Sequence, residues 1–145
     1  MNRNTICSLL LLSIVVMMGA CHDDAWESVP TPIMDFLTKY FPLNEVQSYT
    51  DDNKGTLTVQ IKNGAKIVFD DNYGWMHIES NGIPLPSQLL YDELPAPLYN
   101  YIQEMEQTQS VFGLKREAST ITVYFHDTAV NYNIATERIT YPSAP

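Results

Sequence analysis

The chain has 145 residues, and its 8 Lys and Arg against 17 Asp and Glu give a formal net charge of −9 at pH 7. This length suits a single domain, and the acidic balance disfavours binding to the phosphate backbone of nucleic acids. An aromatic content of 11% is too high for a disordered chain. We therefore expect one folded domain that does not bind nucleic acid.

The first 20 residues have the features of a secretory signal peptide. Arg3 precedes a largely apolar run over residues 6–18, which at about 13 residues is shorter than the roughly 20 that a membrane-spanning helix needs. Two small residues end the run, and Cys21 follows at once. This arrangement resembles the lipobox of bacterial lipoproteins, whose cysteine carries fatty acids such as palmitate and becomes the new N-terminus. We predict a lipoprotein signal peptide over residues 1–20 and lipidation at Cys21. An ordinary signal peptide with a chance cysteine is the alternative.

Lipidation would decide the location of the mature chain, because two or three acyl chains make release from a membrane negligible. We expect an exported protein anchored by lipid at the outer membrane, with residues 21–28 as an acidic tether. Asp23 and Asp24 in that tether resemble a surface-export signal of one group of Gram-negative bacteria. The periplasmic face and the cell surface both stay open. Cys7 leaves with the signal peptide, so no thiol remains for a disulfide, a metal or catalysis.

An internal repeat organises the rest of the chain. Residues 29–37 match residues 94–102, and both segments place apolar residues on one stripe of a helix. Both also carry a proline where the first turn of a helix tolerates it. The first helix should end near Phe41, since Pro42 cannot continue it, and the second should run to about Gln107.

The residues that follow each predicted helix have the pattern of strands. Residues 57–61 and 121–125 alternate apolar and polar side chains, which is typical of half-buried strands. In the first half, Asn63-Gly64 predicts a tight hairpin. Further strands are predicted at residues 67–69, 75–78, 130–134 and 138–141.

Each half therefore consists of a helix followed by about four short antiparallel strands. Side by side, the halves predict an α+β fold: one sheet of about eight strands with both helices on the same face. The repeats cover residues 29–80 and 94–141, joined by a linker over residues 81–93 in which Gln88 to Tyr91 form one helical turn. Together they make a single domain over residues 29–141.

An ordered set of short motifs resembles the PepSY-like, beta-lactamase-inhibitor-protein-like family. The motifs are Pro30-x-x-Ile-x-x-Phe36, Phe41-Pro42, Val46, Asn63-Gly64, Phe69-Asp70, Gly74-Trp75, Ile83-Pro-Leu-Pro86 and Leu94-Pro-Ala-Pro97. The resemblance implies a small secreted bacterial protein, often a lipoprotein, with a tandem helix-plus-sheet repeat. It also implies binding of an enzyme, or restraint of a peptidase, through the open face of the sheet. The family contributes no catalytic residues. After Gln107 the second repeat lacks the Phe-Pro and Gly-Trp motifs, so its last two strands are the less firmly predicted.

The alternation within the strands also predicts a binding surface. If the apolar side chains in the strands over residues 57–61 and 121–125 face the helices, the residues that alternate with them face outward. The outward set comprises Thr58, Gln60, Trp75, His77, Thr122, Tyr124 and His126. A face that mixes aromatic rings with small polar groups suits recognition of a partner. The alternative is that these residues merely pair across strands and cover a solvated sheet. For Trp75 a place in the core is equally open.

No metal site, cofactor or catalytic centre is expected. His126-Asp127 and His77 lie in different repeats without the spacing of metal ligands. The segments Asp51–Gly55 and Asp70–Gly74 are similar to the start of calcium loops, but each lacks a glutamate at the twelfth position. Asp, Asn and Gly are also the residues that tight turns require. An enzyme, the least favoured class, would depend on His77, His126 or Asp127.

The sequence thus predicts a non-catalytic, monomeric envelope lipoprotein that binds or inhibits a secreted or envelope protein through its open sheet face. The alternative is a structural or glycan-binding accessory of an outer-membrane assembly, because carbohydrate binding would also favour exposed aromatic rings.

Overall fold

The computed structural model describes residues 25–141. The predicted signal peptide, the lipidation site Cys21 and the acidic pair Asp23 and Asp24 lie outside the described residues. Within them, no helix combines the length and the apolar character needed to cross a bilayer.

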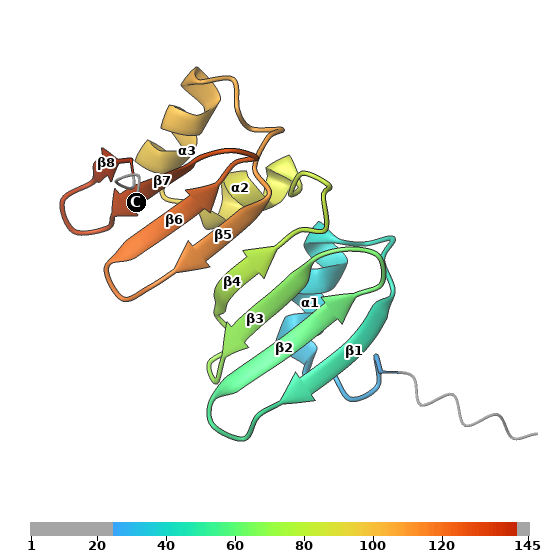
Figure 1. Cartoon of the computed structure of the whole chain (residues 1–145). Coiled ribbons are helices and arrows are strands. Elements are labelled where there is room, and N and C mark those ends of the chain that lie inside the picture. Colours follow the sequence, from blue (N-terminus) through green and yellow to red (C-terminus); the bar gives the residue numbers. More distant parts are fainter. Residues whose placement is uncertain (1–24, 142–145) are drawn as a thin grey trace, which may run out of the picture.

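The described residues form three helices and eight strands (Figure 1). The helices are α1 (Thr31–Tyr40), α2 (Ser87–Glu93) and α3 (Ala96–Glu104). The strands are β1 (Val46–Asp51), β2 (Thr56–Ile61), β3 (Lys66–Asp70), β4 (Trp75–Glu79), β5 (Gly113–Arg116), β6 (Thr120–Tyr124), β7 (Ala129–Asn133) and β8 (Arg138–Thr140).

All eight strands belong to one antiparallel sheet, in which they follow one another in chain order from β1 to β8. Figure 1 shows the helices on one side of this sheet, behind the strands, with no described helix on the other side. The predicted α+β fold with helices on one face is therefore confirmed. We call the uncovered side the open face.

The helices begin and end where local chemistry requires. Pro30 precedes α1 and Pro32 lies in its first turn, where the missing N–H has no partner to lose. The helix ends at Tyr40, and the N–H of Phe41 donates to the carbonyl of Leu37 at 2.7 Å. The predicted end near Phe41 is thus confirmed.

Two helical predictions need correction. The second predicted helix stops at Glu104 instead of Gln107, because Glu106 adopts a left-handed φ of 57° that no α-helix continues through. The single helical turn predicted in the linker is a seven-residue helix, α2. Its Leu89 and Leu90 are fully buried, so packing against the core stabilises the longer helix.

The six predicted strands agree with the structure within one residue at every end. Asn63 takes a left-handed φ of 53° in the turn between β2 and β3, and the N–H of Ile61 donates to the carbonyl of Ala65 at 2.9 Å. The sequence predicted about four strands in each half, but its pattern did not locate β1 and β5. In the structure these two strands open the first and second sets of four.

One hydrophobic core serves both halves. β4 pairs with β5, with Ile78 opposite Leu114 and Glu79 opposite Gly113, so the first set of four strands continues directly into the second. Ile78 and Leu114 are fully buried in a single cluster with the apolar residues of all three helices. Burial of this kind is the main favourable contribution to folding.

Replacing Ile78 with alanine tests whether the two halves fold as one unit. Truncating a buried isoleucine costs about 2–5 kcal/mol, whereas Ile134→Ala, at an exposed position, should cost no more than about 0.5 kcal/mol. In urea, tryptophan fluorescence reports Trp75 in the first half and Trp26 just before it, and far-UV circular dichroism reports the whole sheet. Both signals should shift together in Ile78→Ala. Two separate transitions in the wild type would contradict a shared core.

Candidate functional site on the open face of the sheet

Two rows of side chains cross the open face from strand to strand, as the pairing register defines them. The central row crosses all eight strands and consists of Thr50, Thr58, Val68, His77, Lys115, Thr122, Asn131 and Thr140. The outer row runs from β1 to β7 and consists of Ser48, Gln60, Lys66, Glu79, Gly113, Tyr124 and Ala129. The placement of Thr58, Gln60, His77, Thr122 and Tyr124 on this face agrees with the sequence prediction.

Several of these polar residues are already paired with their neighbours. The hydroxyl of Thr122 donates to the side-chain oxygen of Asn131 at 2.9 Å, across β6 and β7. The side-chain amide of Gln60 donates to the carbonyl of Ile61 at 2.8 Å. The central row therefore consists mostly of short polar side chains, of which Thr122 and Asn131 pair with each other.

A hollow interrupts this surface where the two halves meet. It has a volume of about 420 Å³, and His77, Glu79, Ser80, Phe112, Gly113 and Tyr124 line it. Gly113 has no side chain, so backbone forms part of the floor. A Cβ at this position would lie 3.2 Å from the carbonyl oxygen of Ile78 and 3.4 Å from Cδ2 of Tyr124, so the tyrosine ring lies directly beside the glycine. Glycine within a strand commonly marks such a close approach.

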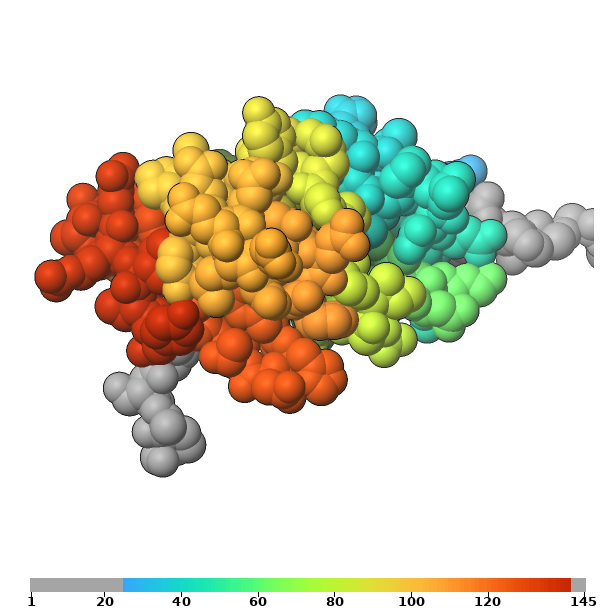
Figure 2. Space-filling model, turned by 90° about the horizontal axis from the view of Figure 1, so that it is seen from above, coloured from blue at the N-terminus to red at the C-terminus, as the bar shows by residue number. Residues whose placement is uncertain are grey.

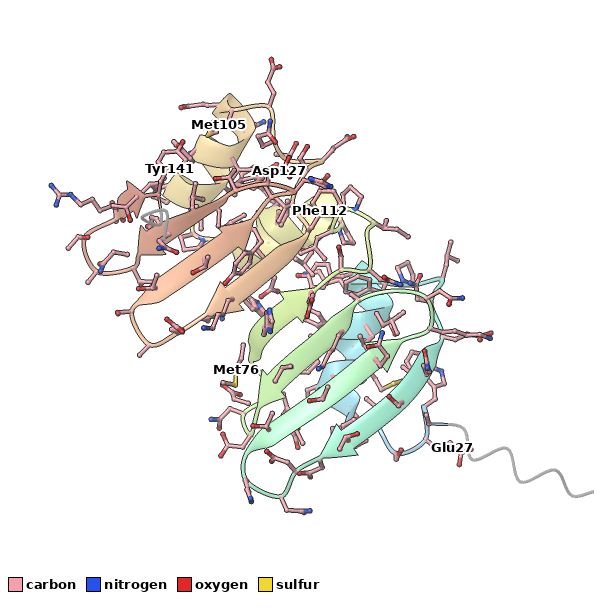
Figure 3. All side chains as sticks on the ribbon, viewed as in Figure 1. Glu27, Met76, Met105, Phe112, Asp127 and Tyr141 are labelled. Atoms are coloured by element: carbon pink, nitrogen blue, oxygen red, sulfur yellow. The ribbon has the colours of Figure 1, made fainter. Side chains whose placement is uncertain are left out.

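His126 lies at the end of the sheet instead of on its face. It follows β6 in a turn closed by the N–H of Phe125, which donates to the carbonyl of Thr128 at 2.8 Å. Its ring is 6.1 Å from that of Phe112, in an edge-to-face arrangement, and its Nδ1 lies 2.7 Å from a carboxylate oxygen of Asp127. Figure 3 shows Phe112 and Asp127 at the same end of the second half. His126 thus borders the hollow through Phe112.

The predicted place of Trp75 on the open face is wrong. Trp75 is only 3% exposed and faces the helices. The cause is a β-bulge in β4: Val68 pairs with His77, but Phe69 pairs with Trp75, so Met76 has no partner. In a regular strand Trp75 and His77 would share a face, and one extra residue between them places them on opposite faces.

On the helix side, Trp75 belongs to a polar junction centred on Glu93 of α2. One carboxylate oxygen of Glu93 accepts a hydrogen bond from the hydroxyl of Tyr40 at 2.8 Å, and the other accepts one from the indole N–H of Trp75 at 2.9 Å. The guanidinium of Arg116 lies 4.0 Å from the centre of the Trp75 ring and donates to the backbone carbonyl of Glu93 at 3.2 Å. The junction therefore links α1, β4, α2 and β5.

Burial and charge shift the acidities of this junction. Burial raises the pKa of Tyr40 to about 12, and the hydrogen bond to Glu93 acts in the same direction. Beside it, the ammonium of Lys39, 2.8 Å from Asp92, holds the pKa of that carboxyl below its usual range. Both contacts join α1 to α2, so these groups have a structural role: they hold one half of the domain against the other.

The two aspartate-rich segments form the turns between β1 and β2 and between β3 and β4, as predicted. One oxygen of Asp52 accepts the N–H groups of Lys54 and Thr56 at 2.8 and 2.9 Å. One oxygen of Asp70 accepts the N–H groups of Asn72 and Gly74, both at 2.9 Å. Turn formation thus accounts for these carboxylates. Over residues 25–141, no three His, Cys, Asp or Glu side chains are grouped so that they could hold a metal ion.

No model of a protein family matches the sequence, and no curated protein matches it. Three solved structures from Bacteroides are similar in fold. The first, from Bacteroides thetaiotaomicron and provisionally described as a calcium-regulated periplasmic protein, has 17% identity and a TM-score of 0.64, covering 79% of this chain and 89% of that one. The second, from Bacteroides vulgatus and provisionally described as a periplasmic protein of the DUF2874 family, has 16% identity and a TM-score of 0.64. It covers 79% of this chain and 89% of that one.

The third, also from Bacteroides vulgatus and provisionally described as a periplasmic protein of unknown function, has 13% identity and a TM-score of 0.61, covering 79% of this chain and 93% of that one. At these identities the likeness concerns the fold alone. The described fold therefore occurs in other bacterial chains, with little of the sequence in common.

Sequence reasoning missed Phe112 and Gly113, although a signal was present. Gly113 interrupts the apolar run Val111-Phe-Gly-Leu114, and an isolated glycine in such a run indicates a bulge or a close approach of another group. Neither residue belongs to the motifs of the repeat, because the two halves differ at this point. The hollow is a product of the joint between the halves.

The raised pKa of Tyr40 predicts a loss of stability at alkaline pH. Its pKa is about 10 in the unfolded chain and about 12 in the folded one, so the folded state holds this proton more tightly. The stabilisation is fully present below pH 10 and is lost as the pH rises from about 10 to about 12. In urea unfolding at pH 8 and pH 11, Tyr40→Phe should lose less stability than the wild type. Tyr91→Phe, at an exposed position, should match the wild type. An equal alkaline loss in Tyr40→Phe would contradict this assignment.

Proposed function

We propose that this chain is an exported, non-catalytic binding module of the PepSY-like, beta-lactamase-inhibitor-protein-like kind, which engages a secreted or envelope protein through the open face of its sheet. The observation that carries the proposal is the uncovered face itself, on which the hollow beside Gly113 and Tyr124 interrupts two rows of side chains. A tandem helix-plus-sheet repeat with an open sheet face is what the family resemblance implies.

The size of the open face supports a protein as the partner. Eight strands spaced about 4.8 Å apart span about 34 Å, and a strand of five residues, the commonest length here, is about 17 Å long. The face therefore offers about 600 Å², about three quarters of the roughly 800 Å² that each partner buries in a standard protein–protein interface. A tyrosine beside a hollow near the middle of such a surface is typical of an interface hot spot.

Export and lipid anchoring complete the proposal. The features of residues 1–20 support secretion, and Cys21 follows them at the position that a lipobox requires. The three similar structures are described as periplasmic, which agrees with an envelope location for this chain as well. An anchor at the outer membrane would hold the domain close to the lipid, separated from it only by the short tether over residues 21–28.

Capture of a partner by the immobilised full chain tests the role of the open face. Envelope extract is passed over the wild type, Tyr124→Ala and the control Tyr91→Ala, whose exposed ring lies on α2. We expect the same protein on the wild type and the control, and at least a tenfold weaker affinity for Tyr124→Ala, because truncating a hot-spot tyrosine costs about 2 kcal/mol or more.

A partner lost from Tyr91→Ala but kept by Tyr124→Ala would place the interface on the helices and overturn the proposal. Binding on a glycan array without any protein partner would instead favour the glycan-binding accessory.

Labelling with palmitate tests the anchor. In cells given labelled palmitate, the wild type and Cys7→Ser should both carry the label and sediment with the membranes, because Cys7 lies within the signal peptide. Cys21→Ser should carry no label and should leave the membrane fraction. A labelled Cys21→Ser chain would show that this cysteine is not the site of acylation.

A further inference from the structure

An apolar cleft lies at one end of the first half, away from the sheet hollow. The connection from α1 to β1, the turn between β2 and β3 and the segment before α2 enclose it, with a volume of about 280 Å³. Figure 2 looks down on the end of the molecule where these segments come together. Phe41, Leu43, Ala65, Ile83 and Leu85 are among the apolar residues that line it, and no charged side chain does.

Two of the lining side chains are exposed to an unusual degree. Leu43 is 95% exposed and Ile83 is 64% exposed, and they come from different segments of the chain. Single exposed apolar residues need no explanation, but here both border the same apolar cleft. A ligand that fills the cleft would cover both.

The cleft continues onto the open face through Ser80. A polar hollow of about 360 Å³ shares Asn63, Gly64, Ser80 and Asn81 with the cleft. That polar hollow in turn shares Glu79 and Ser80 with the hollow beside Gly113 and Tyr124. Ser80 therefore borders all three depressions, which adjoin one another from the end of the first half to the middle of the sheet. We call this series of depressions the path.

The hydroxyl of Ser80 is buried and has no hydrogen-bond partner among the described residues. Buried polar groups are nearly always paired, and each exception calls for an explanation. Rotation about χ1 can direct a serine hydroxyl to a different side, where it can donate to or accept from a group in the adjoining path. A ligand lying across Ser80 would provide that partner.

The lining of the path indicates what kind of ligand fits. The polar hollow carries the side-chain amides of Gln47 and Asn81, the amide of Gln60, whose nitrogen already donates to backbone carbonyls, and one charge of each sign, Lys66 and Glu79. Amides match the N–H and C=O groups of a peptide backbone, and the balanced charges favour no net charge in the ligand. The cleft itself lies below the roughly 300–1,000 Å³ typical of sites for drug-sized molecules. It suits a single large apolar side chain.

We propose that the cleft receives one large apolar side chain of an extended segment of the protein partner, and that the backbone of this segment crosses Ser80 onto the open face. This inference rests on the proposed function, since it assigns the same partner a second contact. Recognition of this kind uses an apolar anchor for affinity and backbone hydrogen bonds for orientation.

Selection from a random peptide library on the immobilised full chain tests the inference. Selected peptides should share one large apolar residue at a fixed position, and alanine at that position should weaken binding at least tenfold in fluorescence anisotropy. Ile83→Asp should weaken binding at least tenfold as well. Tyr91→Asp, with the same 64% exposure but outside the path, should bind like the wild type.

Ser80→Ala separates a binding role from a structural one. Removing a buried hydroxyl that has no partner should raise the midpoint of thermal unfolding, while peptide affinity should fall. A higher midpoint with unchanged affinity would remove Ser80 from the proposed path and overturn that part of the inference.

Three results would overturn the proposal for the cleft: no peptides selected, peptides that bind Ile83→Asp as well as the wild type, or self-association of the chain that Ile83→Asp abolishes. The last would make a second copy the occupant. Capture of the protein partner that depends on Tyr124 but not on Ile83 would refute the cleft and leave the proposed function intact. Capture that depends on neither would refute the proposed function.

Discussion

The pairing of β4 with β5 is the contact on which the rest of the structure depends. Each half supplies four strands and helical cover for one side, and only this ladder turns the two sets into one sheet. On the helix side, Glu93 strengthens the same joint, because its carboxylate accepts hydrogen bonds from Tyr40 and Trp75 and its backbone carbonyl accepts one from Arg116. Backbone pairing on the sheet and polar contacts behind it therefore hold the halves in one orientation.

The joint also produces the surface features that matter for binding. Gly113 stands opposite Glu79 in the ladder, and its missing side chain opens the hollow beside Tyr124. The ladder extends by one more hydrogen bond, in which the N–H of Ser80 donates to the carbonyl of Phe112 at 2.8 Å. Ser80 thereby lies where the hollow, the polar path and the apolar cleft meet. A change in the joint would alter all three.

The sequence predicted correctly the strands that have a clear alternation of apolar and polar residues or a clear turn signal. β2 and β6 alternate cleanly, and Asn63-Gly64 marks the hairpin between β2 and β3. It did not locate β1, whose residues are mostly exposed at the edge of the sheet, or β5, which has four residues and begins with a glycine. Both lack the alternation of apolar and polar residues that identifies a half-buried strand, so neither could be located from the sequence.

The sequence by itself determined the repeat, the helix at the start of each half, the hairpin and the period-two faces of the regular strands, because each depends on residues close together in the chain. The tertiary structure alone decided the face of Trp75, since the bulge at Met76 arises from pairing with β3. It likewise decided the hollow beside Tyr124 and the cleft beneath Ile83. Their walls come from segments far apart in the chain, and no local pattern specifies which segments will meet.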